Sequence, residues 1–337
     1  MLRVAAFTGG LDVPSARFRV RQYISVLSEL GIAVDELIAP LGSFPPAIKW
    51  LRPFWGAATL ACDLPHIAQS WRYDACLLQR EFVSTLATLE FLASRPRFLD
   101  VDDAIFLHRG GRPARRLAQT CDAVICGNAY LADWFGRWNR RTSVVPTAIN
   151  TDSYCPRHDP VPREVRVIGW IGTSSNFRYL LTIQGALARV FAARPRARLR
   201  IVSDRPPHLP ALPADRIEFV RWTQRREILD IQSMDVGIMP LDDSAWARGK
   251  CSFKMLQYMA CGLPVVVSPV GMNAEVLAKG ACGIGASSEA EWVEALIALL
   301  DNEELCTHFG AGGRFLAQSH FSITTVAPTL ARLLLGR

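Results

Sequence analysis

Residues 248–276 read RGKCSFKMLQYMACGLPVVVSPVGMNAEV, and the order of structural signals in this stretch decides the fold. The pattern predicts a helix over residues 253–261 with Ser252 as its N-cap, because a serine hydroxyl can accept a hydrogen bond from a backbone N–H at a helix start. The following Gly-Leu-Pro, residues 262–264, is expected to end the helix. Residues 264–268 then predict a short strand buried on both faces, which is typical of a parallel sheet.

Cations gather at the start of this predicted helix. Lys254 falls in its first turn, and Arg248 and Lys250 precede it, although the chain contains only four lysines. A cation is disfavoured at a helix N-terminus unless an anion is also present, and a helix start flanked by cations is a ready anion site. Gln257 shares the face of Lys254 and offers both a donor and an acceptor. We therefore predict a diphosphate site here; the alternative is a solvated helix start with ordinary surface cations.

The stretch 250–276 resembles the signature region of the family 4 (GT4) glycosyltransferases, which have the GT-B fold. The resemblance is carried by the run MACGLPVV at residues 259–266, followed by Gly271 and the pair Glu275 and Val276. It implies an α/β protein with two Rossmann-like, doubly wound parallel-sheet domains that face a cleft. It also implies transfer of a sugar from a nucleoside-diphosphate sugar to a hydroxyl acceptor (a glycan, a lipid-linked molecule or a small molecule), with a retaining outcome.

Two positions depart from the usual motif of the family, which has a pair of glutamates. The first position is Gly249 and the second is Gln257 in this chain. A subgroup of the family has lysine followed by glutamine or glutamate, placed as Lys254 and Gln257 are. The first glutamate lies near the donor sugar in the family, and no residue of this chain is an obvious replacement for it.

Length and composition predict two globular domains. At 337 residues, half of them apolar, the chain can bury two separate cores. Residues 156–162, PRHDPVP, are polar and proline-rich, as a linker should be. We therefore expect an acceptor-side domain over residues 1–158 and a nucleotide-sugar-binding domain over residues 163–318. The last helices of GT-B proteins commonly cross back, so the resemblance places residues 319–337 against the first domain.

The formal net charge of +7 fits anionic partners such as nucleotide diphosphates, anionic lipids or nucleic acid. Nucleic acid is disfavoured because the chain has no zinc pattern, basic recognition helix or aromatic RNA-binding motif. Nine cysteines without a C-x-x-C pair argue against a disulfide framework or a metal site, and no cofactor is expected. No apolar run has the length of a membrane span, and residues 1–10 do not resemble a secretory signal. A cytoplasmic location is expected, with peripheral contact to the inner face of the cell membrane as an option.

The N-terminal half begins with a predicted buried strand and a loop containing Gly9 and Gly10. Glycines directly after a first strand let the backbone approach a ligand closely, although the dinucleotide spacing G-x-G-x-x-G is absent. In the resembling family this loop faces the acceptor, and the run PSARFR that follows recurs in the subgroup. Arg17 and Arg19 lie in a helix predicted over residues 15–30, where they are either acceptor or phosphate contacts or ordinary surface charges.

Acidic residues follow a strand predicted over residues 97–101, in the run DVDDA, which also matches the subgroup. Asp102 and Asp103 are costly at the end of a buried strand unless they face solvent or a ligand. They either bind sugar or acceptor hydroxyls and serve as a base, or cap the next helix. His108 either contacts the acceptor or is simply exposed. Paired aspartates can bind magnesium, but GT-B enzymes generally neutralise the diphosphate with a helix dipole and cations, so no metal is expected.

Residues 45–71 place Trp50 and Phe54 beside Lys49 and Arg52. One interpretation is an amphipathic segment that rests on a membrane interface. The other, which the apolar periodicity favours, is a pair of helices that covers the core.

The second half opens with a strand predicted over residues 166–171. The turn residues 172–174 are small and lead into a helix that carries Arg178. Free N–H groups at such a turn favour phosphate binding; the alternative is simple helix capping. Because the arginine and lysine that bind the diphosphate near this strand in the broader family are absent, Arg178, Lys250 and Lys254 are expected to replace them.

The functional prediction is glycosyl transfer in which cations and a helix start stabilise the departing diphosphate. Trp222 follows a strand predicted over residues 217–220 and either stacks on the nucleotide base or is an ordinary core or surface tryptophan. The catalytic candidates are Asp102, Asp103, Lys250 and Lys254. The donor-binding candidates are Gly172, Thr173, Ser174, Arg178, Trp222, Arg248, Lys250, Ser252, Phe253, Lys254 and Gln257, and the acceptor-side candidates are Gly9, Gly10, Arg17, Arg19 and His108.

Three alternatives stand beside this prediction. A sugar-nucleotide epimerase of GT-B fold would act on the donor alone. A catalytically silent nucleotide-sugar-binding protein is consistent with Gly249 and Gln257. A membrane-surface scaffold built on residues 45–60 is the third. The sugar, the base and the acceptor depend on loop geometry that residue spacing does not fix.

Overall fold

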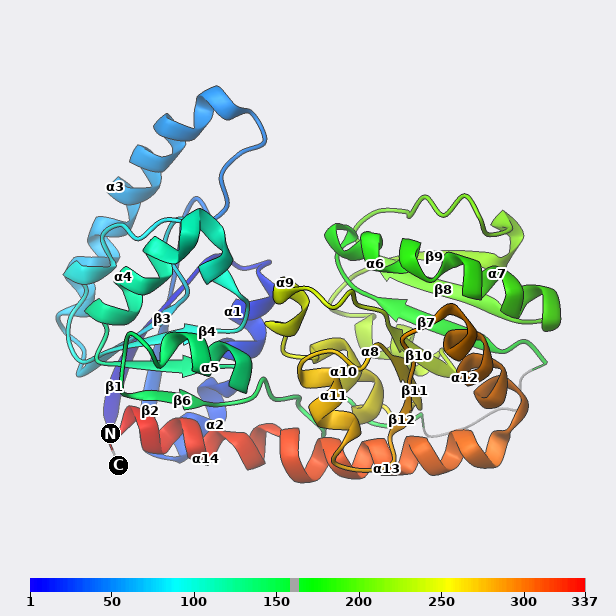
Figure 1. Ribbon diagram of the computed structural model, residues 1–337. Coiled ribbons are helices and arrows are strands. Elements are labelled where there is room, and N and C mark those ends of the chain that lie inside the picture. The colour runs from blue at the N-terminus through cyan, green and yellow to red at the C-terminus, as the bar shows by residue number, and fades with distance from the viewer. Residues whose placement is uncertain (158–163, 337) are drawn as a thin grey trace. The chain divides into compact units, whose positions relative to one another are not determined.

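The computed structural model describes residues 1–157 and 164–336. This part of the chain forms two compact units, each built around one six-stranded parallel sheet with flanking helices (Figure 1). Unit 1 comprises Met1–Ala148, Arg248–Cys251 and Ile323–Arg337, and unit 2 comprises Ile149–Ala247 and Ser252–Ser322. The predicted α/β class with two doubly wound parallel sheets is confirmed. The linker expected over residues 156–162 lies largely outside the described residues.

The sheet of unit 1 has the strand order β2-β1-β3-β4-β5-β6. All residues of β3 and β4 are buried, as expected of parallel strands covered on both faces. Val4 of β1 pairs with Val34 on one side and Ala75 on the other, which fixes the register of the central strands. The strands are β1 (Leu2–Thr8), β2 (Ile32–Ile38), β3 (Ala75–Gln79), β4 (Arg97–Val101), β5 (Ala123–Cys126) and β6 (Thr142–Val144).

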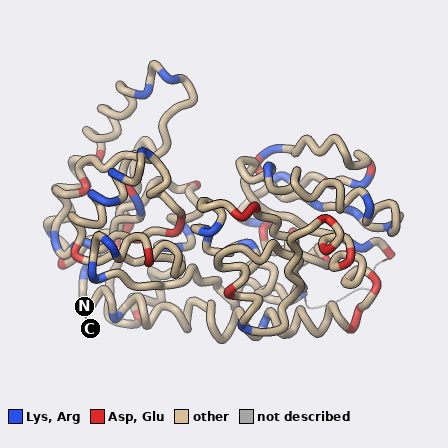
Figure 2. The backbone as a smooth tube through the Cα atoms, viewed as in Figure 1, with Lys and Arg blue, Asp and Glu red and all other residues tan. Residues whose placement is uncertain are grey.

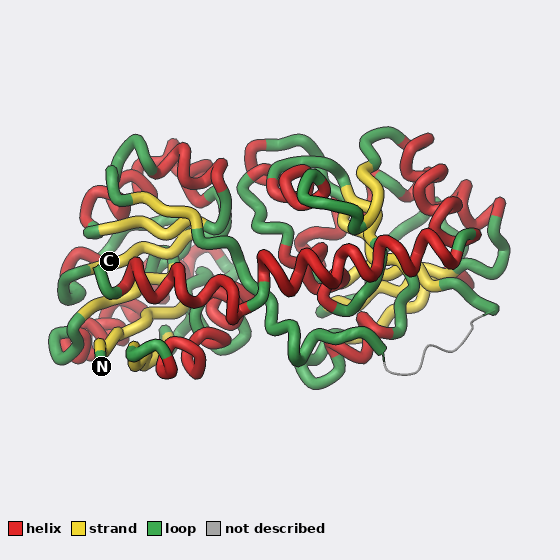
Figure 3. The backbone as a smooth tube through the Cα atoms, turned by 90° about the horizontal axis from the view of Figure 1, so that it is seen from below, coloured by secondary structure: helices red, strands yellow, loops and turns green. Residues whose placement is uncertain are grey.

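The helix predicted over residues 15–30 is broken into two short helices by a 3-10 turn. Val20 at the break has φ −125° and ψ −67°, outside the helical region, and it is buried with Tyr23 in the core of unit 1. The helix at the end of the chain packs into the same core through Ile323 and Val326, and Figure 3 shows it lying against the strands of this unit. The helices are α1 (Pro14–Arg19), α2 (Ile24–Glu29), α3 (Arg52–Ser70), α4 (Arg112–Thr120), α5 (Ala129–Phe135) and α14 (Ile323–Leu334), with 3-10 turns η1 (Arg21–Tyr23), η2 (Lys49–Leu51), η3 (Glu90–Leu92) and η4 (Ile105–Gly111).

A single helix, α3, replaces the helix pair predicted over residues 45–71. The prediction that this segment covers the core is wrong for its first turns, which contain no buried residue before Thr59. Figure 1 shows these turns rising away from the sheet of unit 1. The side of α3 that faces the unit is mostly polar, because its buried residues are Thr59, Asp63, Ile67 and Ser70. Apolar periodicity alone could not show which side of the helix is turned outward.

Asp63 makes the stability of unit 1 depend on pH. Burial, together with the nearby Glu90 carboxylate, raises the pKa of Asp63 from 3.8 to about 6. Between about pH 4 and 6 the native state keeps a proton on Asp63 that the unfolded chain has already released. The free energy of unfolding therefore falls as the pH rises from 4 through 6. Replacing Asp63 by asparagine should remove about 1–2 kcal/mol of this pH dependence. Urea unfolding at several pH values measures it, with exposed Asp12→Asn as the control; an unchanged profile in the Asp63 variant would contradict the assignment.

The sheet of unit 2 has the strand order β12-β11-β10-β7-β8-β9. The chain builds outward from β7 in one direction with β8 and β9 and in the other with β10 to β12, so the strand order reverses between β7 and β10. Ligands of doubly wound sheets bind outside the carboxyl ends of the strands at such a point. The strands are β7 (Val167–Ile171), β8 (Arg198–Ser203), β9 (Ile217–Arg221), β10 (Val236–Met239), β11 (Val265–Val267) and β12 (Gly283–Gly285).

The helix predicted over residues 253–261 and the strand predicted over 264–268 are present as α10 and β11. The long helix α13 packs against α10 and α12 and is the most extended helix of unit 2 in Figure 3. No helix within the described residues is long and apolar enough to cross a membrane. The helices are α6 (Phe177–Thr182), α7 (Gln184–Ala193), α8 (Glu227–Gln232), α9 (Ala245–Arg248), α10 (Phe253–Ala260), α11 (Met272–Leu277), α12 (Glu289–Asp301) and α13 (Glu303–Phe321), with 3-10 turns η5 (Ser174–Asn176) and η6 (Ala214–Arg216).

Candidate functional site

The candidate donor site of unit 2 lies at the carboxyl end of β7, where the strand order reverses. Lys254, in the first turn of α10, extends over the buried ring of Trp170, with its Nζ 5.7 Å from the ring centroid. Gly172 leaves the room for this side chain, because a Cβ at that position would overlap Lys254 Cε. The face of an indole ring attracts a cation. The structure therefore brings Lys254 and the turn after β7 together.

The turn after β7 is closed by hydrogen bonds to an acid. Ser174 donates to Asp204, which follows β8, from its backbone N–H at 2.6 Å and from its hydroxyl at 2.7 Å. Burial opposes ionisation of Asp204, but these two bonds hold its pKa below the usual range. Thr173 Oγ1 lies 2.9 Å from Ser175 Oγ. The Ser174 N–H that was expected to meet a phosphate already donates to a carboxylate, so this residue positions the turn.

Two further donor candidates lie near the carboxyl ends of the strands. Arg178 on α6 donates to the Tyr179 hydroxyl at 2.6 Å, and this bond, with a smaller contribution from the Asp242 carboxylate, raises the pKa of the guanidinium. Trp222 follows β9, is 38% exposed, and donates its backbone N–H to Ser203 O at 2.8 Å. A partly exposed indole thus stands at the same edge of the sheet as the end of β8.

Ser252 does not cap α10, contrary to the prediction. It has φ +51°, and its hydroxyl donates to Asn273 Oδ1 at 2.6 Å instead of accepting from the helix. Asn273 donates in turn to Ser268 O at 3.0 Å, and both side chains are buried. These bonds tie the start of α10 to the end of β11 and so fix the position of Lys254. Phe253, the first residue of α10, is half-buried.

Gln257 belongs to a buried polar group behind α10. Its Nε2 donates to Glu227 on α8 and lies 3.4 Å from the Tyr154 hydroxyl. Gln257, Glu227 and Tyr154 are each at most 3% exposed. Arg314 on α13 completes the group by donating to Tyr154 O at 2.5 Å and to Ala260 O at 2.7 Å. The amide nitrogen of Gln257 is therefore committed to packing α8 against α10, and the predicted contact with ribose or phosphate can involve only the amide oxygen.

Arg248 and Lys250 belong to unit 1, whereas Lys254 belongs to unit 2. Asn128, the N-cap of α5, donates its Nδ2 to Lys250 O at 3.1 Å and lies 3.4 Å from Arg248 O. Cys251 Sγ donates to Asp102 O at 3.2 Å. The backbone of this segment is thus held by the loops after β4 and β5. The single cationic cluster predicted at the start of α10 is divided between the two units.

Gly249, at the position of the first glutamate in the motif that the sequence resembles, packs against the loop after β4. A Cβ at this position would lie 2.6 Å from Ala104 Cβ and 2.9 Å from Ala104 N, closer than real Cβ contacts. A glutamate cannot occupy the position unless this loop moves. The replacement of the first glutamate is therefore built into the packing of unit 1.

Asp102 and Asp103 share one arginine. Arg80, which follows β3, donates to Asp102 Oδ1 at 2.6 Å and to Asp103 Oδ2 at 2.5 Å. Burial raises the pKa of Asp102, and the Arg80 guanidinium opposes the rise. The two carboxylates keep 15% and 24% of their side-chain surface exposed. Neither caps the following turn, whose N-cap residue is Ala104 and which has no side-chain cap, so the capping alternative is wrong.

Arg19 is neither a surface charge nor exposed to a ligand, contrary to both interpretations of its sequence position. Its side chain is 2% exposed and pairs with Asp100, with Nη2 2.6 Å from Oδ1 and Nε 3.0 Å from Oδ2. Its Nη1 donates to Val145 O at 2.8 Å. Although burial opposes it, the Asp100 carboxylate raises the pKa of Arg19. The pair joins α1 to β4 inside unit 1.

The remaining acceptor-side candidates lie around α1 and η4. Gly9 O accepts from Ser43 N at 3.1 Å, which closes the loop after β1. The Arg17 guanidinium lies over the Phe18 ring, 4.6 Å from its centroid, and is half-buried. The other two, Gly10 and His108, lie in the loop after β1 and in η4, and His108 is exposed.

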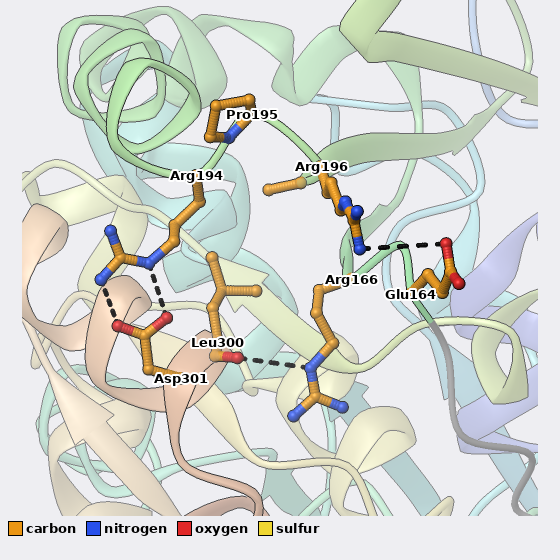
Figure 4. Close-up of a pocket in the computed structure, with 8 residues that line it drawn as sticks. Glu164, Arg166, Arg194, Pro195, Arg196, Leu300 and Asp301 are labelled. Atoms are coloured by element: carbon orange, nitrogen blue, oxygen red, sulfur yellow. Dashed lines mark hydrogen bonds and ion pairs between the residues drawn. The ribbon is translucent and has the colours of Figure 1, made fainter.

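A cavity of about 370 Å³ lies elsewhere in unit 2, beside the amino ends of β7 and β8 (Figure 4). Arg194 Nε donates to Asp301 at 2.6 Å, and Arg166 Nε lies 3.4 Å from Leu300 O. Arg196 Nη1 lies 3.9 Å from Glu164 Oε2, which also lines the cavity. Because its cations are paired and the cavity lies at the edge opposite the carboxyl ends of the strands, we do not assign the donor to it.

Sequence reasoning missed four polar residues that hold the candidate residues in place: Arg80 and Asn128 in unit 1, and Asp204 and Glu227 in unit 2. Arg80 and Asp204 come directly after a strand, and Asn128 is the second residue after one; this is the signal that drew attention to the DVDDA run and could have found them too. Glu227 is the first residue of α8. Neither its position nor its neighbours in the sequence indicate that its side chain is buried.

The two six-stranded parallel sheets place the chain in the GT-B class of α/β folds, which solved glycosyltransferase structures share. The structure of Anabaena Alr3699/HepE in complex with UDP-glucose is 14% identical, covers 100% of both chains and has a TM-score of 0.74. Sucrose-phosphate synthase from Thermosynechococcus elongatus is 14% identical, with a TM-score of 0.72 over 100% of this chain and 99% of that one. WaaG, a glycosyltransferase involved in lipopolysaccharide biosynthesis, is 13% identical over 100% of both chains, with a TM-score of 0.69. At these identities the likeness shows the fold alone.

Residues 165–302 match the family described as Glycosyl transferases group 1. The matched segment begins just before β7, ends just after α12, and includes Gly172, Lys254 and Gln257. No curated protein matches the chain in sequence. The family match supports a glycosyltransferase-type domain in unit 2.

Proposed function

We propose that the protein is a glycosyltransferase that moves a sugar from a nucleoside-diphosphate sugar to a hydroxyl group of an acceptor. One observation carries the proposal: Lys254 is held beside Gly172 and over Trp170 at the carboxyl end of β7, inside the segment that matches group 1 glycosyl transferases. The similar Anabaena structure contains UDP-glucose, which supports a nucleotide sugar as the donor.

In this proposal unit 2 holds the donor. The Lys254 ammonium and the N-terminal end of α10 favour the negative charge that develops on the leaving diphosphate. Trp170 beneath the lysine fixes its direction, and the bonds from Ser252 to Asn273 fix the start of the helix. Trp222 offers a stacking surface for the base at the end of β9.

In unit 1, the loop after β4 is the proposed acceptor side. Asp102 and Asp103 bind acceptor hydroxyls, and the raised pKa of Asp102 suits a group that takes up a proton. Arg80 already pairs with both carboxylates and offsets part of their charge, which supports a transfer without a metal ion. The resemblance to GT4 enzymes supports retention of the anomeric configuration. The acceptor is a glycan, a lipid-linked molecule or a small molecule with a free hydroxyl.

Replacing Lys254 by alanine should weaken binding of the donor about tenfold, because a cation facing the diphosphate is lost while the fold is kept. A thermal-shift screen over nucleoside diphosphates and their sugars identifies the best ligand, and isothermal titration calorimetry then measures its affinity. Lys279→Ala is the matched control, since Lys279 is an exposed lysine of the same unit. Equal donor affinity in the Lys254 variant and the control would reject the assignment of Lys254.

A catalytically silent nucleotide-sugar-binding protein is the second candidate, and the packing of Gly249 favours it. The tight contact with Ala104 excludes the glutamate that the family places near the donor sugar. Tight donor binding with no transfer and no hydrolysis on a broad acceptor panel would support the silent binder over the transferase.

A further inference from the structure

The outer face of α3 is apolar although it is exposed. Ten residues of this helix are exposed, and only Arg52 and Gln69 among them are polar. The inward side is mostly polar, and within the described residues Thr59 Oγ1 and Asp63 Oδ2 have no hydrogen-bond partner there. A helix on the surface of a water-soluble unit normally shows the opposite arrangement. The exposed apolar members are Pro53, Phe54, Ala57, Ala58, Ala61, Leu64, Pro65 and Ala68.

Large apolar side chains concentrate at the start of α3 and in the turn before it. Phe44 and Ile48 are 58% and 53% exposed, and Trp50 and Phe54 are each 70% exposed. Figure 1 shows this part of unit 1 standing clear of the sheet. An exposed apolar surface of this kind marks an interaction site.

Positive charge borders the apolar face. Lys49 and Arg52 are exposed beside Trp50 and Phe54, and no acidic residue occurs between positions 37 and 62. In Figure 2 the tube of unit 1 carries only basic positions at the start of α3. The combination of exposed aromatic rings and cations without acids is complementary to a surface that is both apolar and anionic.

Exposed aromatic and basic side chains also occur at the base of α3 and on α4. Trp71, directly after α3, is 69% exposed and donates its indole N–H to Leu92 O at 3.0 Å. Phe91, next to it, lies under the guanidinium of Arg116, 5.8 Å from the ring centroid. Three arginines of α4 are exposed: Arg112, Arg115 and Arg116.

We propose that the outer face of α3, together with the turn before it, docks on the surface of an anionic lipid bilayer. Tryptophan and phenylalanine enter the interface between headgroups and acyl chains, and lysine and arginine remain at the headgroups. The helix lies along the surface, because only one of its faces is apolar. A second copy of the chain fits less well, since the same face of the partner offers no acidic residue between positions 37 and 62 to pair with Lys49 and Arg52. The proposal does not depend on glycosyl transfer.

Sedimentation of the full chain with lipid vesicles tests the proposal. The protein should bind vesicles of phosphatidylcholine containing about one-third phosphatidylglycerol, more weakly at high ionic strength and much more weakly without the anionic lipid. The double variant Trp50→Ser/Phe54→Ser should reduce the partition coefficient about tenfold or more, and Lys49→Glu/Arg52→Glu should do the same. Both variants should keep the thermal stability of the parent, because none of these side chains is buried.

The matched control is Phe315→Ser, since Phe315 is 66% exposed on α13 of unit 2 and should not affect vesicle binding. Failure of the parent protein to bind anionic vesicles would overturn the proposal, as would unchanged binding by both double variants. Sedimentation velocity without lipid tests the remaining possibility, that two copies of the chain pair through this face. A parent dimer that becomes a monomer in Trp50→Ser/Phe54→Ser, with no vesicle binding, would assign the face to a second copy and contradict the proposal.

Discussion

Replacing Arg19 by alanine is expected to lower the free energy of unfolding by about 3–5 kcal/mol, the cost of leaving one partner of a buried ion pair without the other. Asp100 is 2% exposed, and three hydrogen bonds from Arg19 satisfy its carboxylate. The same substitution also removes the donor to Val145 O. Equilibrium unfolding in urea, followed by circular dichroism, measures the difference.

Arg17→Ala is the matched control, because Arg17 lies on the same short helix but is only half-buried. Its cost should stay below about 1 kcal/mol. The double variant Arg19→Met/Asp100→Leu should recover much of the lost stability, since replacing both partners by apolar side chains leaves no buried charge. A loss of less than about 1 kcal/mol in Arg19→Ala would show that the pair is not buried as described.

Replacing Arg80 by alanine is expected to cost about 2–3 kcal/mol at neutral pH, because two partly buried carboxylates lose their shared cation. The loss should be smaller in acid. Without Arg80 the pKa of Asp102, already raised by burial, rises further. The native state then binds more protons than the unfolded state in the acid range, so the stability of the variant falls as the pH increases through that range.

Arg80→Lys is the control for charge without the paired geometry, and it should retain part of the stability. Measuring both variants by urea unfolding at acid and neutral pH separates the loss of charge from the loss of two directed hydrogen bonds. A deficit in Arg80→Ala that does not change with pH would contradict the assignment of Arg80 to Asp102 and Asp103. Under the proposed function, the same variant should also lose acceptor turnover while keeping donor affinity.

The elements that the sequence predicts well are those set by local signals. Helix α10 and strand β11 follow from an apolar run bounded by glycine and proline, and both occur within one or two residues of the predicted positions. Lys254 also lies at the start of that helix, as its position in the sequence requires. Such features depend on neighbours along the chain, which the sequence shows directly.

Pairings between distant residues were not predictable from one sequence. Arg19 and Asp100 are 81 residues apart, and periodicity gave no reason to bury a charged residue on α1. Ser252 has the residue type of an N-cap, yet a tertiary bond to Asn273 takes its hydroxyl. The orientation of α3 was missed for a related reason. A helix with one polar and one apolar side has two possible orientations, and only the contacts of Thr59 and Asp63 with unit 1 decide between them.

The central claim is that unit 2 binds the diphosphate of a nucleotide sugar through Lys254. The most direct test is a calorimetric comparison of two ligands, the best nucleoside diphosphate and its parent nucleoside, on the natural protein and on Lys254→Ala. The substitution should weaken diphosphate binding by about 1.4 kcal/mol or more and leave nucleoside binding unchanged. Equal losses for the two ligands, or no loss for the diphosphate, would contradict the claim.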